Sequence, residues 1–251
     1  MLPDSLLVCL INLDRSPERL ATMSARLAGL GWAFERMPAV DGRAIDWRHH
    51  PDVDERGFER AQGRRLQPGD VGCYLSHLAA LRRFLDSPAR HLLVLEDDAD
   101  PEPDCSAVIQ ALLAMPERWD VVKLSGYHSA APVGEAALTP SRRLAIPFAP
   151  HSNTAALLFN RDAAERLLRT MRPMVLPYDH ALERPWVHGV RLRIVSPPPC
   201  RAEDGSESTI PLDRDLKIRG FKRWPTLLGR VRNEAARLAW ALGQLPRPWS
   251  S

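Results

Sequence analysis

The sequence predicts an α/β domain followed by a basic helical tail. Short apolar runs typical of buried strands alternate along the chain with segments of helical periodicity. The chain has 251 residues, of which 45% are apolar and 26% charged, a size and composition that suit one large folded domain. No apolar run approaches the roughly 18 residues of a membrane span. We therefore expect a domain over residues 1–212 and a separate tail over residues 213–251.

The first elements form a strand, a tight turn, a helix and a second strand. Residues 5–13 are almost continuously apolar, as in a strand buried on both faces of a parallel sheet. Ser16 and Pro17 then offer an N-cap and a first-turn proline, after which apolar residues recur at helical spacing. An extended run at residues 33–37 completes a β-α-β unit. Ligands of such units bind at the carboxyl ends of the strands, so the polar loop at residues 12–15 is a candidate contact.

The rest of the domain continues the alternation after an interruption. Residues 41–68 are charged and poorly periodic, which predicts an irregular insertion. The first element expected after it is a helix that follows Pro68-Gly69-Asp70 and carries an apolar stripe from Val71 to Leu85. A strand at 91–95, a helix at 106–115, strands at 120–124 and 154–159, and a helix at 161–171 are expected next.

Three consecutive carboxylates, Glu96, Asp97 and Asp98, are the sharpest chemical signal in the chain. They directly follow the apolar strand at 91–95, so they must gather at its carboxyl end. Like charges held so closely repel each other, and a hard divalent cation such as Mn²⁺ or Mg²⁺ would relieve that repulsion. A solvated acidic turn is the alternative interpretation.

Other polar residues give weaker signals. Ser76 and His77 are adjacent on the expected helix, about 100° apart, so they need not face the same ligand. A lone helical histidine is more often packed than catalytic. Asp179 lies between two prolines in a segment expected to be a polar loop, where it could serve as a base or simply as a turn residue.

The sequence also lacks several familiar motifs. Neither phosphate-binding glycine motif follows the first strand, so the phosphates of a nucleotide would need a metal and basic side chains such as Arg15, Arg19 and Lys123. The four cysteines form no C-x-x-C pair, which favours reduced, packed thiols. The first 13 residues do not read as a secretory signal, and we expect a cytoplasmic protein.

Taken in order, these segments resemble glycosyltransferase family 25, which includes bacterial lipopolysaccharide and lipooligosaccharide sugar transferases and collagen galactosyltransferases. The resemblance covers about residues 5–210 and depends on the following segments: Val8 to Leu20, Pro38 to Gly42, Pro68 to His77, Leu93 to Asp98, Asp120 to Leu124, Thr154 to Leu168, Pro177 to His180, and Pro197 to Pro199. Three positions depart from the family pattern: Asp70 replaces a Glu, Asn153 a common Gly, and Leu157 a common aromatic residue.

The resemblance implies a GT-A-like, Rossmann-type nucleotide-sugar domain that transfers a hexose with inversion from a UDP-sugar, often UDP-galactose, to a saccharide or glycolipid acceptor. Carried over by position, the residues that would lie at the nucleotide are Asn12, Leu13, Arg15, Arg19 and Asp41. The segment from Glu96 to Asp98 would hold Mn²⁺ or Mg²⁺, with Asp98 and Glu96 as the ligands, and the residues facing the diphosphate-sugar or acceptor would be Ser76, His77 and Lys123. The base would be Asp179, with His77 in reserve. A catalytically silent nucleotide-sugar-binding protein and a metal-dependent phosphohydrolase are the rival interpretations. The intact carboxylates argue against the first, and the lack of further metal-spaced ligands argues against the second.

The tail is electrostatically distinct from the domain. Residues 213–251 hold 9 Lys and Arg against 3 Asp and Glu, a net charge of +6, which leaves −3 for residues 1–212. The tail also holds three of the seven tryptophans, and its apolar residues fall at helical steps between Pro225 and Leu242. Such a helix either packs on the domain or contacts an anionic membrane surface as a peripheral anchor. Nucleic-acid binding is disfavoured because the rest of the chain is net negative.

Overall fold

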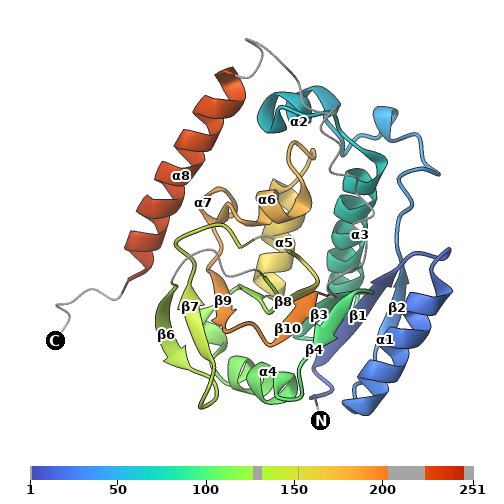
Figure 1. The fold of residues 1–251 in the computed structure, drawn as a ribbon, viewed down its shortest axis with the longest axis vertical. Helices are drawn as coiled ribbons and strands as arrows, with labels where there is room; N and C mark the ends of the chain where they lie inside the picture. The colour runs from blue at the N-terminus through green and yellow to red at the C-terminus, as the bar shows by residue number, and fades with distance from the viewer. Residues whose placement is uncertain (1, 127–131, 152, 203–223, 246–251) are drawn as a thin grey trace.

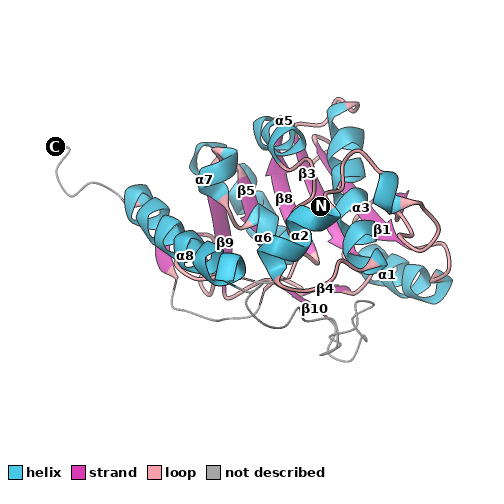
Figure 2. Cartoon of the chain, turned by 90° about the horizontal axis from the view of Figure 1, so that it is seen from above, coloured by secondary structure: helices cyan, strands magenta, loops and turns pink. Residues whose placement is uncertain are grey.

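A computed structural model describes residues 2–126, 132–151, 153–202 and 224–245. They form a large mixed β-sheet with helices on both faces, and a small second sheet of two strands (Figures 1 and 2). The strands are β1 (Leu6–Asn12), β2 (Glu35–Pro38), β3 (His91–Glu96), β4 (Ala99–Pro101), β5 (Val121–Lys123), β6 (Val133–Ala137), β7 (Arg143–Ile146), β8 (Ala156–Asn160), β9 (Leu192–Ser196) and β10 (Cys200–Ala202). The helices are α1 (Pro17–Gly29), α2 (Glu55–Gln62), α3 (Pro68–Leu85), α4 (Cys105–Leu113), α5 (Arg161–Thr170), α6 (Tyr178–Leu182), α7 (Pro185–His188) and α8 (Trp224–Gln244), with 3-10 turns η1 (Trp47–His49) and η2 (Pro116–Arg118).

The main sheet has eight strands in the order β2-β1-β3-β8-β5-β9-β7-β6. Strands β2, β1 and β3 are parallel, as expected for the β-α-β start of the chain. Strand β8 runs antiparallel to both β3 and β5, so the sheet is mixed rather than parallel. Because β8 is buried on both faces, its apolar residues suit a strand that runs parallel or antiparallel to its neighbours. The sequence pattern therefore could not predict its direction.

The sheet separates two hydrophobic cores. Side chains of one parity, including Ile11, Val94 and Leu157, pack on the face covered by α3 and α5. Those of the other parity, including Leu10 and Leu95, pack on the face covered by α1 and α4. A one-residue slip of any central strand would exchange the two sets, so burial on both faces fixes the register of the strand ends.

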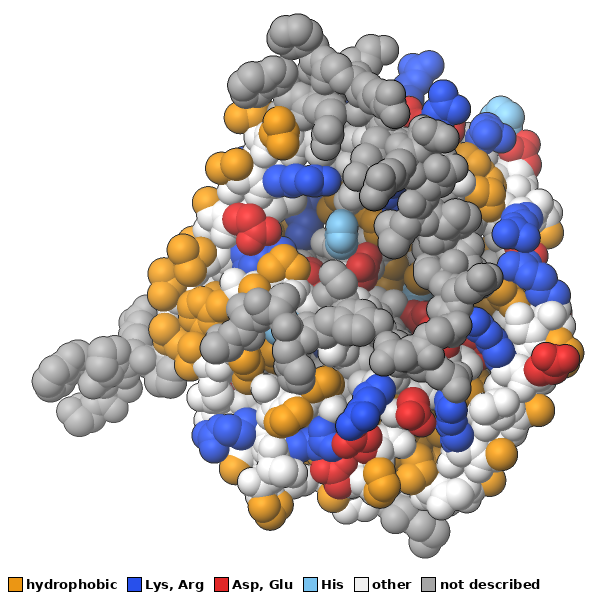
Figure 3. All heavy atoms as spheres, in the orientation of Figure 1, with side chains coloured by type: hydrophobic (Ala, Val, Ile, Leu, Met, Phe, Trp, Pro, Cys, Tyr) orange, Lys and Arg blue, Asp and Glu red, His pale blue; other side chains and the backbone are white. Residues whose placement is uncertain are grey.

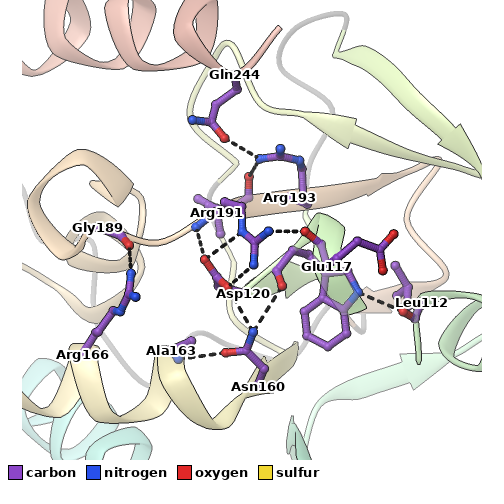
Figure 4. Close-up of polar contacts among 12 residues, drawn as sticks. Leu112, Glu117, Asp120, Asn160, Ala163, Arg166, Gly189, Arg191, Arg193 and Gln244 are labelled. Carbon is purple, nitrogen blue, oxygen red and sulfur yellow. Dashed lines mark hydrogen bonds and ion pairs between the residues drawn. The ribbon is translucent and has the colours of Figure 1, made fainter. Parts of the chain in front are cut away.

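A polar cluster locks the strand ends opposite the carboxylates (Figure 4). Asp120, just before β5, accepts hydrogen bonds from the Arg191 backbone N–H at 2.7 Å and from the Asn160 side-chain amide at 3.0 Å. The side-chain oxygen of Asn160 in turn caps α5 by accepting from the Ala163 N–H at 2.8 Å. The cluster therefore ties β5, β8, β9 and the start of α5 together.

Two segments differ from the sequence prediction. The stretch 41–68 is not irregular throughout, because residues 55–62 form α2. The Asp54 side chain caps that helix by accepting a hydrogen bond from the Gly57 N–H. Phe58 is the one buried residue of the helix, so the sequence shows no repeating apolar pattern there. The prediction of a loop around Asp179 is wrong as well, because residues 178–182 form α6, whose Tyr178 and Leu182 side chains are buried.

The C-terminal helix α8 lies beside α2 and α7 (Figure 1). It covers the segment in which helical spacing was expected, whereas the predicted domain boundary at residues 212 and 213 lies outside the described residues. Among the described helices, none is both long and apolar enough to cross a membrane.

Candidate functional site

A cavity of about 190 Å³ opens where β3 ends, against the start of α6. Four carboxylates line it, namely Asp70, Glu96, Asp98 and Asp179, together with Cys73, Asn153, Thr154, Ala155, Pro177 and Tyr178. The carboxyl end of a strand in an open α/β sheet is the usual place for a ligand. Three of the residues proposed from the sequence, Glu96, Asp98 and Asp179, therefore share one cavity.

Glu96 is the last residue of β3 and faces α3. Its Oε1 accepts a hydrogen bond from the Thr154 hydroxyl at 2.6 Å and lies 2.9 Å from His77 Nε2. Desolvation by burial opposes ionisation of this carboxyl, but the hydrogen bonds from His77 and Thr154 hold its pKa below the ordinary value. The His77 ring is buried and stacks on Tyr178 with centroids 4.1 Å apart. His77 thus fixes the Glu96 carboxylate in position.

Asp97 faces the opposite side of the sheet and is neutralised there. Its Oδ2 accepts from the Asn12 amide at 2.8 Å, and its Oδ1 accepts from Arg19 at 3.1 Å. The same Asn12 amide donates to the Ser16 carbonyl at 3.0 Å, which ties the first loop to the start of α1. Asn12, Arg19 and Asp97, all proposed from the sequence, meet at this point.

Asp98 has one carboxylate oxygen left without a partner. Its Oδ1 is buried and makes no hydrogen bond within the described part of the chain. Burial, together with the neighbouring charges of Glu96 and Asp97, raises the pKa of Asp98 to about 6. A buried carboxylate oxygen without a partner, beside a second carboxylate, fits a hard divalent cation such as Mn²⁺ or Mg²⁺.

A softer ligand set lies next to these carboxylates. Ligand atoms of Cys73, His77 and Glu96 all lie within 4.8 Å of one another. Burial raises the pKa of the Cys73 thiol well above its usual value. Thiol and imidazole ligands suit softer ions, whereas Mn²⁺ and Mg²⁺ take oxygen ligands. The oxygen atoms of Glu96 and Asp98 are therefore the better candidates for a metal.

The two remaining carboxylates of the cavity play different parts. Asp70 is satisfied, because Arg64 donates to both of its oxygens at 2.7 Å and the Gln67 N–H completes a capping box at the start of α3. Asp179 stands in the first turn of α6, where its Oδ1 accepts from the His180 N–H at 2.8 Å. Asp179 is half-buried and lines the cavity, so it can face a substrate hydroxyl.

Other residues proposed from the sequence have partners elsewhere. Arg15 and Asp41 form an exposed ion pair, and the Leu13 carbonyl accepts from the Ser16 N–H at 2.9 Å. Ser76 donates to the Gly72 carbonyl at 2.6 Å and accepts from the Val40 N–H at 2.8 Å, which pins α3 to the turn after β2. Neither Ser76 nor the Arg15–Asp41 pair lines the cavity, and contact of these residues with a donor stays a prediction.

Lys123 is likewise withdrawn from the cavity. It is buried, 1% exposed, and its ammonium donates to Glu183 at 2.5 Å and to the His151 carbonyl. Glu183 also accepts from the His151 N–H at 2.9 Å. Lys123 thus forms a buried ion pair between β5 and the end of α6, and its contact with a phosphate stays a prediction.

Sequence reasoning missed Thr154, Tyr178 and Glu183. Thr154 and Tyr178 look like ordinary strand-edge and core residues, and Glu183 carries no motif. One signal was available at Asn153, which replaces a glycine common in the resembling family. Its φ of 103° lies in the left-handed region, and its Oδ1 accepts from the Ala155 N–H at 2.7 Å to hold that turn.

The fold and the site define an α/β domain with a carboxylate-lined ligand cavity at its strand ends. Residues 7–182 match the family described as Glycosyltransferase family 25 (LPS biosynthesis protein). The chain therefore belongs to glycosyltransferase family 25, as the motifs predicted.

Curated relatives carry the same family name. A "Glycosyltransferase 25 family member" of Drosophila pseudoobscura pseudoobscura is 32% identical over 100 residues, 38% of this chain and 16% of the relative, and one of Anopheles gambiae is 32% identical over 122 residues, 46% and 21% of the two chains. A "Probable inactive glycosyltransferase 25 family member 3" of Rattus norvegicus is 30% identical over 125 residues, 47% and 22%. The matches thus span less than a quarter of each of these relatives.

The Lys123–Glu183 pair yields a stability prediction. Lys123→Met should lower the free energy of unfolding by about 3–5 kcal/mol, because it leaves a buried carboxylate without its main partner. Adding Glu183→Gln should cost clearly less than the sum of the two single changes, since the amide oxygen still accepts from His151. Urea unfolding of the four proteins measures this coupling.

The exposed Arg43 supplies the control, since Arg43→Met should stay within about 0.5 kcal/mol of wild type. Strict additivity of the two changes would show that Lys123 and Glu183 do not stabilise each other.

Asp98 yields a prediction on pH-dependent stability. Its pKa is raised from 3.8 to about 6, so its favourable contribution is complete below the lower value and lost as the pH rises through the upper one. Asp98→Asn does not titrate and should become more stable than wild type as the pH rises from about 4 to 6, by about 3 kcal/mol above that range. Thermal unfolding in EDTA across this range measures the difference. A difference that does not change with pH would contradict the raised pKa.

Proposed function

We propose that this chain transfers a hexose from a UDP-sugar to a saccharide or glycolipid acceptor in a metal-dependent, inverting reaction on a GT-A-like fold, with galactose as the first donor sugar to test. Membership of the family supports a glycosyltransferase role. The observation that carries the finer proposal is the buried, unpartnered oxygen of Asp98 in a cavity that also contains Asp179.

On this proposal Asp98 and Glu96 hold the Mn²⁺ or Mg²⁺. The bound ion supplies a Lewis acid beside the diphosphate, where negative charge builds up on the departing UDP. His77 and Thr154 keep Glu96 ionised and oriented for that task. Asp97 binds Asn12 and Arg19, and so shapes the first loop, where we place the nucleotide with Leu13, Arg15 and Asp41.

Asp179 acts as the base in the same proposal. The acceptor hydroxyl gives its proton to the Asp179 carboxylate while its oxygen bonds to the anomeric carbon and the bond from that carbon to the UDP oxygen breaks. A single displacement of this kind inverts the configuration at the anomeric carbon. His77 is held between Glu96 and Tyr178, so we assign it a positioning role and give the proton transfer to Asp179.

The biological setting is part of the proposal. The matching family description mentions lipopolysaccharide biosynthesis, which supports a lipopolysaccharide or lipooligosaccharide acceptor. We place the enzyme in the cytoplasm, where nucleotide sugars are the available donors. Some relatives are named inactive, which keeps a silent nucleotide-sugar-binding role as the competing proposal.

A donor panel separates these roles. The chain is incubated with UDP-sugars and Mn²⁺, with and without oligosaccharide acceptors, and UDP, free sugar and glycoside are followed. Acceptor-dependent glycoside supports transfer, and binding of a UDP-sugar without turnover supports the silent role. Release of free sugar or phosphate that ignores the acceptor supports a hydrolase.

Asp98→Asn should abolish metal-dependent transfer while the protein stays folded. The amide is a weaker ligand than the carboxylate for a hard cation, and the substitution removes a charge that repels Glu96 and Asp97. Initial rates across a Mn²⁺ titration, with circular dichroism as the folding check, measure this. The matched control is Asp4→Asn, an exposed carboxyl that should retain wild-type rates. Turnover of Asp98→Asn at the wild-type rate would remove Asp98 from the metal site.

Asp179→Asn should slow transfer by about 10²–10⁴, the range for loss of a general base, with UDP-sugar affinity largely kept. Single-turnover rates and donor titrations separate chemistry from binding. His77→Ala should instead disturb the metal dependence, because it frees Glu96. Loss of donor affinity in Asp179→Asn with the chemical step intact would make Asp179 a binding residue.

A further inference from the structure

Helix α8 presents an apolar face away from the domain. Five of its side chains are about half exposed or more: Leu227 48%, Leu228 64%, Val231 70%, Leu238 51% and Leu242 54%. Elsewhere in the described chain, the most exposed large hydrophobic residues are Val187 at 43% and Val133 at 42%. Figure 3 shows hydrophobic side chains gathered on the side of the molecule where Figure 1 draws α8. The exposed apolar surface of the protein is thus concentrated on one helix.

The opposite face of α8 attaches the helix to the domain. Ala241 is fully buried, and Trp240 packs on the core beneath α3 and α5. Thr226 donates to the Arg60 carbonyl at 2.8 Å, Gln244 accepts from Arg193 at 3.2 Å, and Arg237 lies 3.6 Å from Glu183. The contacts that hold α8 are therefore largely polar.

Helix geometry shows that the two faces are distinct. At about 100° per residue, the five exposed apolar side chains fall within an arc of about 100°. Thr226, Arg237 and Gln244 lie about 130–150° from the centre of that arc, on the other side of the helix axis, and Ala241 lies about 90° from it. A helix whose only role was to pack on the core would turn the apolar arc inward. Here that arc is left facing outward.

We propose that the outward face of α8 docks on an anionic membrane surface, with the helix lying flat in the lipid headgroup region. Arg232 is exposed about 40° beyond one edge of the apolar arc, and Arg230 is exposed about 60° beyond the other edge, where Glu234 is also exposed. The sequence around the helix adds further basic residues, since residues 213–251 carry a net charge of +6. Apolar insertion flanked by Lys and Arg is the pattern of an interfacial helix.

Charge favours an anionic membrane over a second copy of the chain as the partner of the exposed α8 face. Two copies meeting through the exposed face of α8 would bring the Arg230 and Arg232 side chains of both copies close together, which is repulsive. An anionic leaflet attracts each basic residue near its surface. The helix has 21 residues and a length of about 30 Å, and its side facing the domain carries the polar residues Thr226, Arg237 and Gln244. The inference does not depend on which sugar the site transfers.

Vesicle binding by the full chain tests the proposal. Co-sedimentation with vesicles of phosphatidylethanolamine and phosphatidylglycerol should exceed that with phosphatidylcholine alone by about tenfold or more, and added salt should reduce it. Val231→Asp/Leu238→Asp should lower binding to the anionic vesicles about tenfold or more. Val133→Asp/Val187→Asp, which charges the other two exposed sites, is the matched control and should bind as wild type.

A second pair of variants and two further measurements complete the test. Arg230→Gln/Arg232→Gln leaves the apolar face intact and should weaken vesicle binding and reduce its dependence on salt. This variant tests membrane docking if circular dichroism shows that Val231→Asp/Leu238→Asp does not fold. Equal binding to neutral and anionic vesicles, or no binding, would overturn the proposal. So would a stable dimer in sedimentation equilibrium that Val231→Asp/Leu238→Asp converts to a monomer, because α8 would then dock on a second copy.

Discussion

The alternation of side chains at the end of β3 is the constraint on which the site depends. Three consecutive carboxylates cannot all face one way from a strand, so Glu96 faces α3 and Asp97 faces α1. Each face supplies its own neutralising partners: His77 and Thr154 for Glu96, and Asn12 and Arg19 for Asp97. Asp98, in the turn that follows, feels both neighbours and has a buried oxygen without a partner. The unsatisfied group is therefore a product of strand geometry.

The buried charges of the protein are of two kinds: some are fully paired with other protein groups, which we call closed, and others have an unpaired atom and line a cavity, which we call open. Lys123 and Glu183 form a closed pair, since each is the other's main partner and the His151 backbone completes it. Asp98 is open and lines a cavity large enough for a ligand group. A closed pair serves the fold and offers nothing to a substrate. An open carboxylate with a raised pKa costs stability, which is typical of functional sites.

The sequence predicted the elements whose signals are local and repeated. Continuous apolar runs located β1, β3 and β8, helical spacing located α1, α3 and α5, and three adjacent acids located the cavity. Local signals could not predict the direction of β8, because it depends on which strands β8 pairs with in the folded sheet. They also could not predict the helix at Asp179, because that helix depends on the burial of Tyr178. Spacing also could not show that Lys123 is paired, since its partner Glu183 lies 60 residues away.

The chain beyond the matched region is physically connected to the site. The family match ends at residue 182, at the end of α6, and Glu183 follows directly. Glu183 contacts Lys123 on β5 and lies 3.6 Å from Arg237 on α8, so one carboxylate links the central sheet, α6 and the C-terminal helix. Asp179 is in the same short helix. The Glu183 N–H also donates to the Asp179 carbonyl at 3.0 Å, so the ion pairs to β5 and α8 end one helical turn from the carboxylate proposed as base.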